Sequence, residues 1–331
     1  SAYRKTAWRV IPLLMVCYLV AYLDRVNVGF AKLQMLDDLK FSEAVYGLGA
    51  GVFFVGYLMF EIPSNIALHK YGARRWIARI MMSWGLLSAA MMFVETPMSF
   101  YLLRFLIGIA EAGFFPGIIF YLTTWFPSHR RGVMISLFIA ALPISSMLGS
   151  LISGLIMQTL DGVAGYAGWQ WLFVIEGLPA VALGAAVFFL LHDRIADARW
   201  LSPDEKRGMQ AALDREARAK AHHSVRDGLL NPKIWLLGAV YFCLVLGQYV
   251  ISVWMPTIIR NSGVAEPWAI GVLSAIPYSV ATVCMVLVGR SSDRVREYRW
   301  HLAICAFIGA GGVIFGTLFG ASLWLSMIGL T

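Results

Sequence analysis

The chain is poor in charged side chains. Only 14% of its 331 residues are charged, whereas 59% are hydrophobic. A soluble protein of this length could not bury so much apolar surface. The positive mean hydropathy of +0.71 also indicates a chain that is too apolar for a soluble protein. The composition therefore excludes a soluble globular protein and predicts an all-α membrane protein.

Residues that carry enzyme chemistry are also scarce. The four cysteines show no paired spacing, and we interpret them as small apolar filler in spans: Cys17, Cys243, Cys284 and Cys305. No paired His, Cys or Asp ligands and no nucleophile elbow accompany the spans. We therefore expect no metal, no cofactor and no enzymatic activity. We also expect no cleavable signal peptide, because the first apolar segment has full span length and lacks a small-residue cleavage site.

Long apolar runs are abundant. About 20 apolar residues cross a bilayer as a helix, and nine runs reach that length: 8–31, 45–68, 76–94, 98–126, 133–160, 171–191, 234–259, 268–289 and 302–320. A tenth begins near Ser322, close to the end of the chain.

The net charge of +8 reports orientation and not nucleic-acid binding. With a cytoplasmic N-terminus, 22 of the 27 Lys and Arg residues fall on the inner side. Three fall in outer loops: Lys32, Lys40 and Arg260. This asymmetry predicts that the N-terminus is cytoplasmic.

The spans fall into two groups around a polar stretch at 192–233. Within it, Ser202-Pro-Asp-Glu205 matches a capping box that starts a surface helix, and Asn231-Pro232 precedes the seventh span. We expect three parts: a six-helix bundle (1–191), a cytoplasmic linker with an amphipathic helix (192–233) and the start of a second bundle (234–331).

Two arginines and two acids interrupt the first and fourth apolar runs: Asp24, Arg25, Arg104 and Glu111. A charge at mid-bilayer costs about 2.5 to 17 kcal/mol, so such residues face a wet interior or a partner. At 1.5 Å per residue, both arginines lie about 9 Å below the outer surface, and Glu111 lies about 10.5 Å deeper than Arg104. Two guanidinium groups at one depth can grip a carboxylate. A static salt-bridge network is the competing interpretation.

Several strings resemble the anion:cation symporter branch of the major facilitator superfamily. They are Tyr22-Leu-Asp-Arg-Val-Asn27, Phe60-Glu-Ile-Pro-Ser-Asn65, residues 104–117 (RFLIGIAEAGFFPG) and residues 171–180 (WLFVIEGLPA). That branch includes bacterial carriers for tartrate, phthalate, sugar acids and hydroxyphenylacetate. The resemblance implies two six-helix bundles, of which this chain would cover about nine and a half spans. It also implies a multi-pass protein of the bacterial inner membrane.

The resemblance extends to two basic loops and assigns roles to residues. The loops after the second and eighth spans resemble the superfamily motif Gly-x-x-x-Asp-Arg-x-Gly-Arg-Arg, which locks one conformation: Lys70, Gly72, Arg74, Arg75, Gly289, Asp293 and Arg294. The chain departs from the motif at Asn65, His69 and Arg296. The resemblance also implies proton coupling by Asp24 and Glu111 and anion contact by Arg25 and Arg104.

Polar residues in other spans could complete a substrate site: Tyr22, Tyr57, Gln248, Tyr249 and Tyr278. Ordinary interhelical hydrogen bonds are the alternative for each. We expect Gln248 and Tyr249 to be the contribution of the second half.

The sequence thus predicts a proton-coupled symporter that takes up a small organic carboxylate. We expect a monomer in the lipid bilayer, with no nucleic-acid partner. One alternative is an organic anion or organophosphate exchanger of the same fold, although span seven lacks the basic residue typical of that design. Another is a membrane anion sensor that does not transport.

Overall fold

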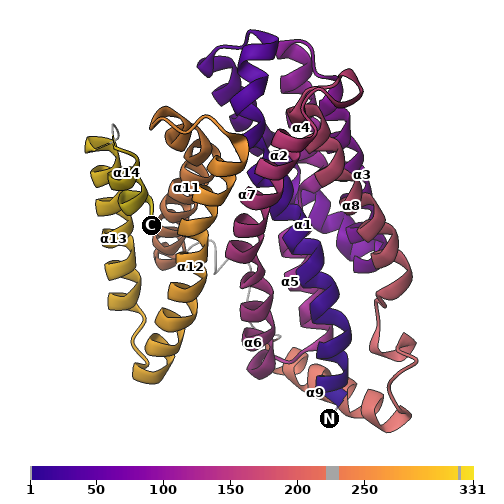
Figure 1. Cartoon of the computed structure of the whole chain (residues 1–331). Coiled ribbons are helices and arrows are strands. Elements are labelled where there is room, and N and C mark those ends of the chain that lie inside the picture. Colours follow the sequence, from indigo (N-terminus) through magenta and orange to yellow (C-terminus); the bar gives the residue numbers. More distant parts are fainter. Residues whose placement is uncertain (1, 221–230, 320–321) are drawn as a thin grey trace. The chain divides into compact units, whose positions relative to one another are not determined.

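The computed structural model describes residues 2–220, 231–319 and 322–331, and these ranges hold helices and no strand (Figure 1). The first elements are α1 (Ala2–Leu39), α2 (Glu43–Tyr71), α3 (Ala73–Ala90), η1 (Met91–Phe93), α4 (Pro97–Glu111), α5 (Phe114–Trp125), α6 (Ser128–Ile139), α7 (Ala141–Thr159), η2 (Val163–Gly165) and α8 (Gly168–Leu190). They are followed by η3 (Ile195–Asp197), α9 (Pro203–Lys220), α11 (Pro232–Asn261), α12 (Pro267–Val295), α13 (Arg299–Leu318) and α14 (Leu323–Leu330).

The described residues contain nine segments that are long and apolar enough to cross a membrane, as predicted, and α14 lies where the tenth was expected. Two of the nine are not single helices. The fourth breaks between α4 and α5 at Ala112 and Gly113, and the fifth changes helix at Ala140.

Large apolar side chains cover the outside of these helices. Trp8, Leu58 and Phe189 are 74%, 73% and 76% exposed, and they belong to three different helices. Exposed apolar surface on this scale is stable only against hydrocarbon, because water would penalise it. The protein is therefore a multi-pass membrane protein.

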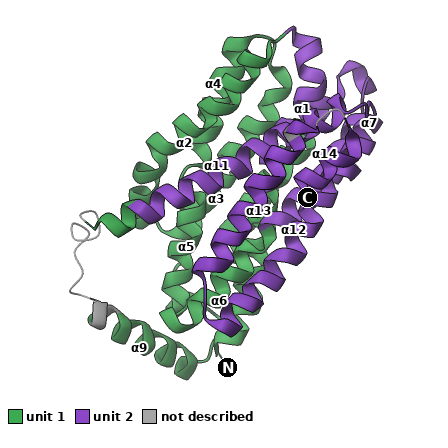
Figure 2. Cartoon of the chain, turned by 90° about the vertical axis from the view of Figure 1, so that its left-hand side faces the viewer, with its two compact units in different colours: residues 1–21, 41–141, 173–235 green, residues 22–40, 142–172, 236–331 purple. Residues whose placement is uncertain are grey.

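The described chain forms two compact units (Figure 2). Unit 1 comprises residues 1–21, 41–141 and 173–235, and unit 2 comprises residues 22–40, 142–172 and 236–331. The predicted bundle boundaries at 191 and 234 stay predictions.

Within unit 1, α2 and α4 run in the same direction in close contact. A Cβ on Gly108 of α4 would overlap the carbonyl oxygen of Phe53 on α2, and a Cβ on Gly56 would lie 2.5 Å from the carbonyl oxygen of Phe105. Small residues let backbones approach in this way, and van der Waals packing then replaces the hydrophobic effect that lipid cannot supply. This contact fixes the face of α4 that carries the predicted charges.

Within unit 2, α1 contacts α11 at Gly29, where a Cβ would lie 2.9 Å from the Val253 carbonyl oxygen, and α7 contacts α12. At the second contact, a Cβ on Gly154 would lie 2.6 Å from the Pro267 carbonyl oxygen, and a Cβ on Gly271 would lie 2.5 Å from the Ser150 carbonyl oxygen. The structure corrects the placement of Lys32 in an outer loop. Because α1 extends to Leu39, Lys32 lies inside the helix, is 1% exposed and places its ammonium 3.4 Å from the centroid of the Trp254 ring.

The predicted caps around the polar stretch are confirmed. The Glu205 amide donates to the Ser202 hydroxyl at 3.2 Å, and the Ser202 amide donates to the Glu205 carboxylate at 3.0 Å. Lys5 donates to the same carboxylate at 2.8 Å and thereby holds the pKa of Glu205 below its ordinary value. The Asn231 side chain accepts from the Lys233 amide at 3.0 Å at the start of α11. Residues 221–230 of the predicted linker lie outside the described residues.

Substituting Gly108 by alanine should lower the thermal stability of the detergent-purified protein. The added methyl must push α4 away from Phe53, and overpacking of this kind costs about 1–3 kcal/mol. Gly51→Ala is the matched control, since a Cβ there meets nothing within 4 Å. Equal melting temperatures for the two variants would show that the α2–α4 contact is looser than described.

Candidate functional site

Unit 1 buries an arginine and an acid on one helix. Arg104 and Glu111 both belong to α4 and are 7% and 1% exposed. Their spacing of seven residues puts them on nearly one face, as the sequence predicted. Burial of both groups requires polar or aromatic surroundings, because an isolated ion would not be stable in hydrocarbon.

An aromatic residue that sequence reasoning missed lies against this arginine. The guanidinium carbon of Arg104 is 4.8 Å from the centroid of the Phe53 ring on α2. The Phe53 ring is in turn 6.0 Å from the ring of Tyr57, which was a predicted site residue. Phe53 precedes Tyr57 by one helical turn, so this spacing was the available signal.

Glu111 stands at a discontinuity. It is the last residue of α4, and Gly113, with a φ of 83°, is the N-cap of α5. The acid thus lies where one membrane span changes course. The apolar run 98–126 predicted a continuous span here.

Unit 2 carries the second pair of charges. Arg25 donates a hydrogen bond to the Tyr249 hydroxyl, and its guanidinium carbon lies 5.0 Å and 5.7 Å from the ring centroids of Tyr22 and Tyr249. Asp24 is 5% exposed and accepts a hydrogen bond of 3.0 Å from the side-chain amide of Asn27. Asp24 and Arg25 are adjacent on α1 but have different partners, since Asp24 bonds to an asparagine and Arg25 contacts two tyrosines.

The structure thus brings three predicted residues together: Arg25, Tyr22 and Tyr249. Gln248 precedes Tyr249 on α11 and is half-buried, and Tyr278 on α12 lies beside Ser252 of α11. Arg25 and Arg104 belong to different units, so their joint grip on one anion stays a prediction.

The first basic loop has an acidic partner that the motif does not supply. The Asp193 carboxylate, just beyond α8, accepts a 2.8 Å hydrogen bond from the Arg74 amide at the start of α3. A Cβ on Gly72, whose φ is +87°, would lie 2.9 Å from this carboxylate. Asp193 thereby caps α3 and interacts with the positive end of its dipole. Arg74 also lies 5.2 Å from the Phe188 ring and Lys70 lies 5.4 Å from the Tyr71 ring, whereas Arg75 is exposed.

The second loop follows α12. Asp293 accepts a 3.4 Å hydrogen bond from the Tyr298 hydroxyl, Arg294 is exposed, and a Cβ on Gly289 would meet nothing within 4 Å. Arg296 replaces the usual glycine of the motif yet adopts a φ of 54°. It therefore accepts a left-handed conformation that costs a side chain about 1–2 kcal/mol.

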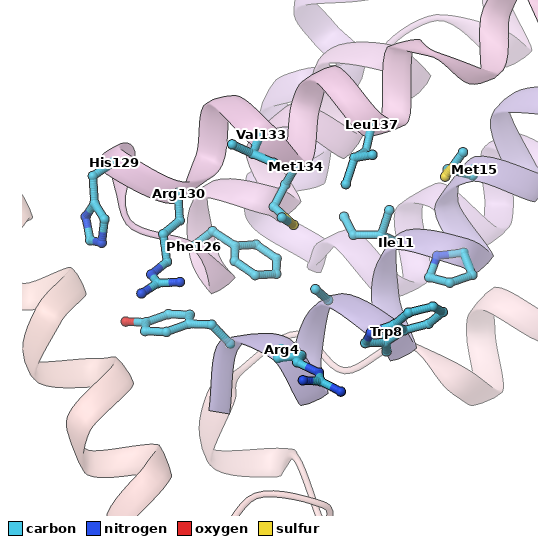
Figure 3. Close-up of a pocket in the computed structure, with 13 residues that line it drawn as sticks. Arg4, Trp8, Ile11, Met15, Phe126, His129, Arg130, Val133, Met134 and Leu137 are labelled. Atoms are coloured by element: carbon cyan, nitrogen blue, oxygen red, sulfur yellow. The ribbon is translucent and has the colours of Figure 1, made fainter. Parts of the chain in front are cut away.

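A large groove lies elsewhere in unit 1, between the start of α1 and the start of α6 (Figure 3). Its volume is about 740 Å³, and apolar side chains such as Ile11, Met15, Val133 and Leu137 line it. Arg4 and Arg130 are also part of the lining. None of the predicted site residues belongs to it. Groups of three or more metal-ligating side chains are absent from the described ranges.

Buried charges within a bundle of apolar spans are typical of membrane carriers and channels. Among these, the Major Facilitator Superfamily model matches residues 14–331, so the chain belongs to that superfamily. It is a transporter and not an enzyme.

Curated relatives carry transporter names. A Pseudomonas putida protein provisionally named metabolite transport protein NicT is 52% identical over 330 residues, which cover 99% of this chain and 76% of the relative. An Agrobacterium vitis protein provisionally named as a tartrate transporter is 48% identical over 331 residues, which cover 99% of this chain and 76% of that protein.

Solved structures share the fold. A bacterial homolog of the human lysosomal transporter Spinster, in an inward-facing and occupied conformation, has a TM-score of 0.76 at 17% identity. The match covers 100% of this chain and 72% of that one. A D-xylose–proton symporter has a TM-score of 0.68 at 15% identity, covering 98% of this chain and 79% of the other.

Substituting Asp193 by alanine should lower the melting temperature of the purified protein. Loss of the cap leaves the Arg74 amide without its acceptor, and removing a cap costs about 0.5–2 kcal/mol. Asp197→Ala removes an exposed carboxylate nearby and should leave the melting temperature unchanged. A stable Asp193→Ala protein would mean that water replaces the cap.

Proposed function

We propose that this transporter takes up a small organic carboxylate together with protons. The observation that carries the proposal is the presence, in each compact unit, of an arginine and an acid within the membrane spans: Arg25 with Asp24, and Arg104 with Glu111. Buried charges with a purely structural role would be replaced at little cost by apolar residues, so the presence of an arginine and an acid in each unit favours a working role.

The arginines would bind the anion. A guanidinium presents two parallel N–H donors that match a carboxylate, and an aromatic face beside it stabilises its charge. Tyr22 and Tyr249 surround Arg25 in this manner. The tartrate name of the relative at 48% identity supports a carboxylate as substrate.

The acids would carry the protons. A carboxyl group that is buried in one conformation and wetted in another binds a proton more tightly when buried. Glu111, at 1% exposure, meets the first condition in this structure. Alternation of the two states then links release of the proton to release of the anion.

The proposal also includes an orientation and a location. The distribution of basic residues favours a cytoplasmic N-terminus, and the bacterial relatives favour the inner membrane. We propose a monomer as the working unit.

Exchange of one anion for another is the second candidate. It needs the arginines but no acid that changes protonation. The two candidates therefore differ in what happens when Glu111 can no longer release a proton.

Substituting Glu111 by glutamine in the full-length protein should abolish the accumulation of carboxylate that an inward proton gradient drives. Exchange of labelled for unlabelled carboxylate should persist, because a neutral amide mimics the protonated acid. The measurement is uptake into proteoliposomes with a panel of labelled carboxylates. Glu95→Gln, at an exposed position, is the control. Wild-type uptake that ignores the gradient would sink the coupling proposal and favour the exchanger.

Substituting Arg25 or Arg104 by lysine should raise KM for the transported acid about tenfold or more, a loss of about 1.4 kcal/mol. Lysine keeps the charge but lacks the paired donors of a guanidinium. Initial uptake rates at varied substrate concentration give the KM. Arg199→Lys, on the exposed surface, should match wild type. An unchanged KM in both arginine variants would remove them from the site.

A further inference from the structure

The break in the fourth span leaves backbone polar groups without helical partners. Ala112 has an extended conformation (φ −53°, ψ 133°), and Gly113 has a left-handed one (φ 83°, ψ 1°). In hydrocarbon, an unpaired backbone carbonyl costs several kcal/mol, so a break needs a substitute partner. The string Phe60–Asn65 supplies that partner here, and the family resemblance assigns no role to this string.

Ser64, in the Phe60–Asn65 string of α2, supplies this partner. Its hydroxyl donates to the Ala112 carbonyl oxygen at 2.6 Å and accepts from the Trp76 indole nitrogen at 2.9 Å. Ser64 is 5% exposed, so water does not compete freely for these bonds. The indole holds the hydroxyl hydrogen toward Ala112, because the N–H of Trp76 occupies a lone pair of the oxygen.

Gly113 fits this arrangement in two ways. Its positive φ disfavours any side chain, and a Cβ there would overlap the Ser64 hydroxyl. Two strings that are about 50 residues apart thus meet at a single hydroxyl group.

Trp76 is itself held firmly. Its ring stacks on Tyr71 at a centroid distance of 5.6 Å, and the Arg79 guanidinium carbon lies 4.2 Å from its centroid. Trp76 belongs to the first turns of α3, directly after Gly72 and the Asp193 cap. The basic loop is therefore joined to the helix break through one indole.

We propose that Ser64 is a positioning residue for Glu111, with Trp76 holding its hydroxyl in place. This inference rests on the proposed role of Glu111 in proton coupling. The hydrogen bond from Ser64 holds the backbone at Ala112, the residue directly after Glu111. It thereby fixes the direction in which the Glu111 side chain points from the end of α4. Without this bond, the chain can pass from α4 to α5 along another path. The carboxyl group of Glu111 is then displaced, whereas Arg25 and Arg104 keep their positions.

The test compares proton-driven accumulation with exchange in proteoliposomes for Ser64→Ala, Ser64→Thr and Trp76→Phe. Ser64→Ala should reduce accumulation about 3- to 10-fold, the equivalent of one lost hydrogen bond, and leave exchange near wild type. Ser64→Thr keeps the hydroxyl and should restore accumulation. Trp76→Phe should act in the same direction as Ser64→Ala. Ser83→Ala is the control, since among the described residues that hydroxyl bonds to the Arg79 and Ile80 carbonyl oxygens of its own helix.

The double variant Ser64→Ala/Glu111→Gln separates this inference from the proposed function. If Ser64 acts through Glu111, the double variant should exchange labelled for unlabelled carboxylate as fast as Glu111→Gln alone. Loss of exchange together with accumulation in Ser64→Ala, or failure of Ser64→Thr to restore it, would overturn the inference and leave a structural role. If Glu111→Gln loses proton-driven accumulation while Ser64→Ala accumulates like wild type, the inference is overturned as well. If Glu111→Gln itself keeps proton-driven accumulation, the proposed function is overturned instead. If Ser64→Ala does not fold, Trp76→Phe and Ser64→Thr give the same comparison.

Discussion

The cost of placing polar groups in hydrocarbon governs this structure. Backbone amides are satisfied by forming helices, and side-chain charges are satisfied by local partners within each unit. The same constraint explains the exceptions. Where the fourth span breaks, the serine of another helix takes the place of the missing helical partner. Where Arg25 lies in a span, a tyrosine hydroxyl accepts its hydrogen bond.

Glycine at the helix crossings makes these partnerships possible. The contact at Gly108 brings α2 close enough for Phe53 to cover Arg104, and the same pair of helices brings Ser64 to Ala112. Lipid offers no hydrophobic gain for helix association, so close packing must hold the pair together. Packing and polar satisfaction are therefore a single requirement along α2 and α4.

The spans, the caps of α9 and α11 and the buried charges could be predicted because each depends on residues near in sequence. Apolar run length, a serine three residues before a glutamate and a charge among leucines are all local signals. The partners of the site could not. Ser64 and Ala112, or Asp193 and Arg74, meet only after folding. The break at Gly113 was missed because a glycine in a span serves packing and turning equally well, and Lys32 was misplaced because a lysine near a span end resembles a loop residue.

The aromatic faces beside the two arginines bear on how membrane spans tolerate buried guanidinium groups. A guanidinium without an anion would pay a large desolvation cost in the span. Contact with Tyr22, Tyr249 or Phe53 offsets part of it, because a cation over an aromatic ring gains about 0.5–2 kcal/mol. That gain is smaller than what a paired carboxylate offers. The aromatic contacts therefore contribute to the stability of two charges that hydrocarbon alone would not tolerate.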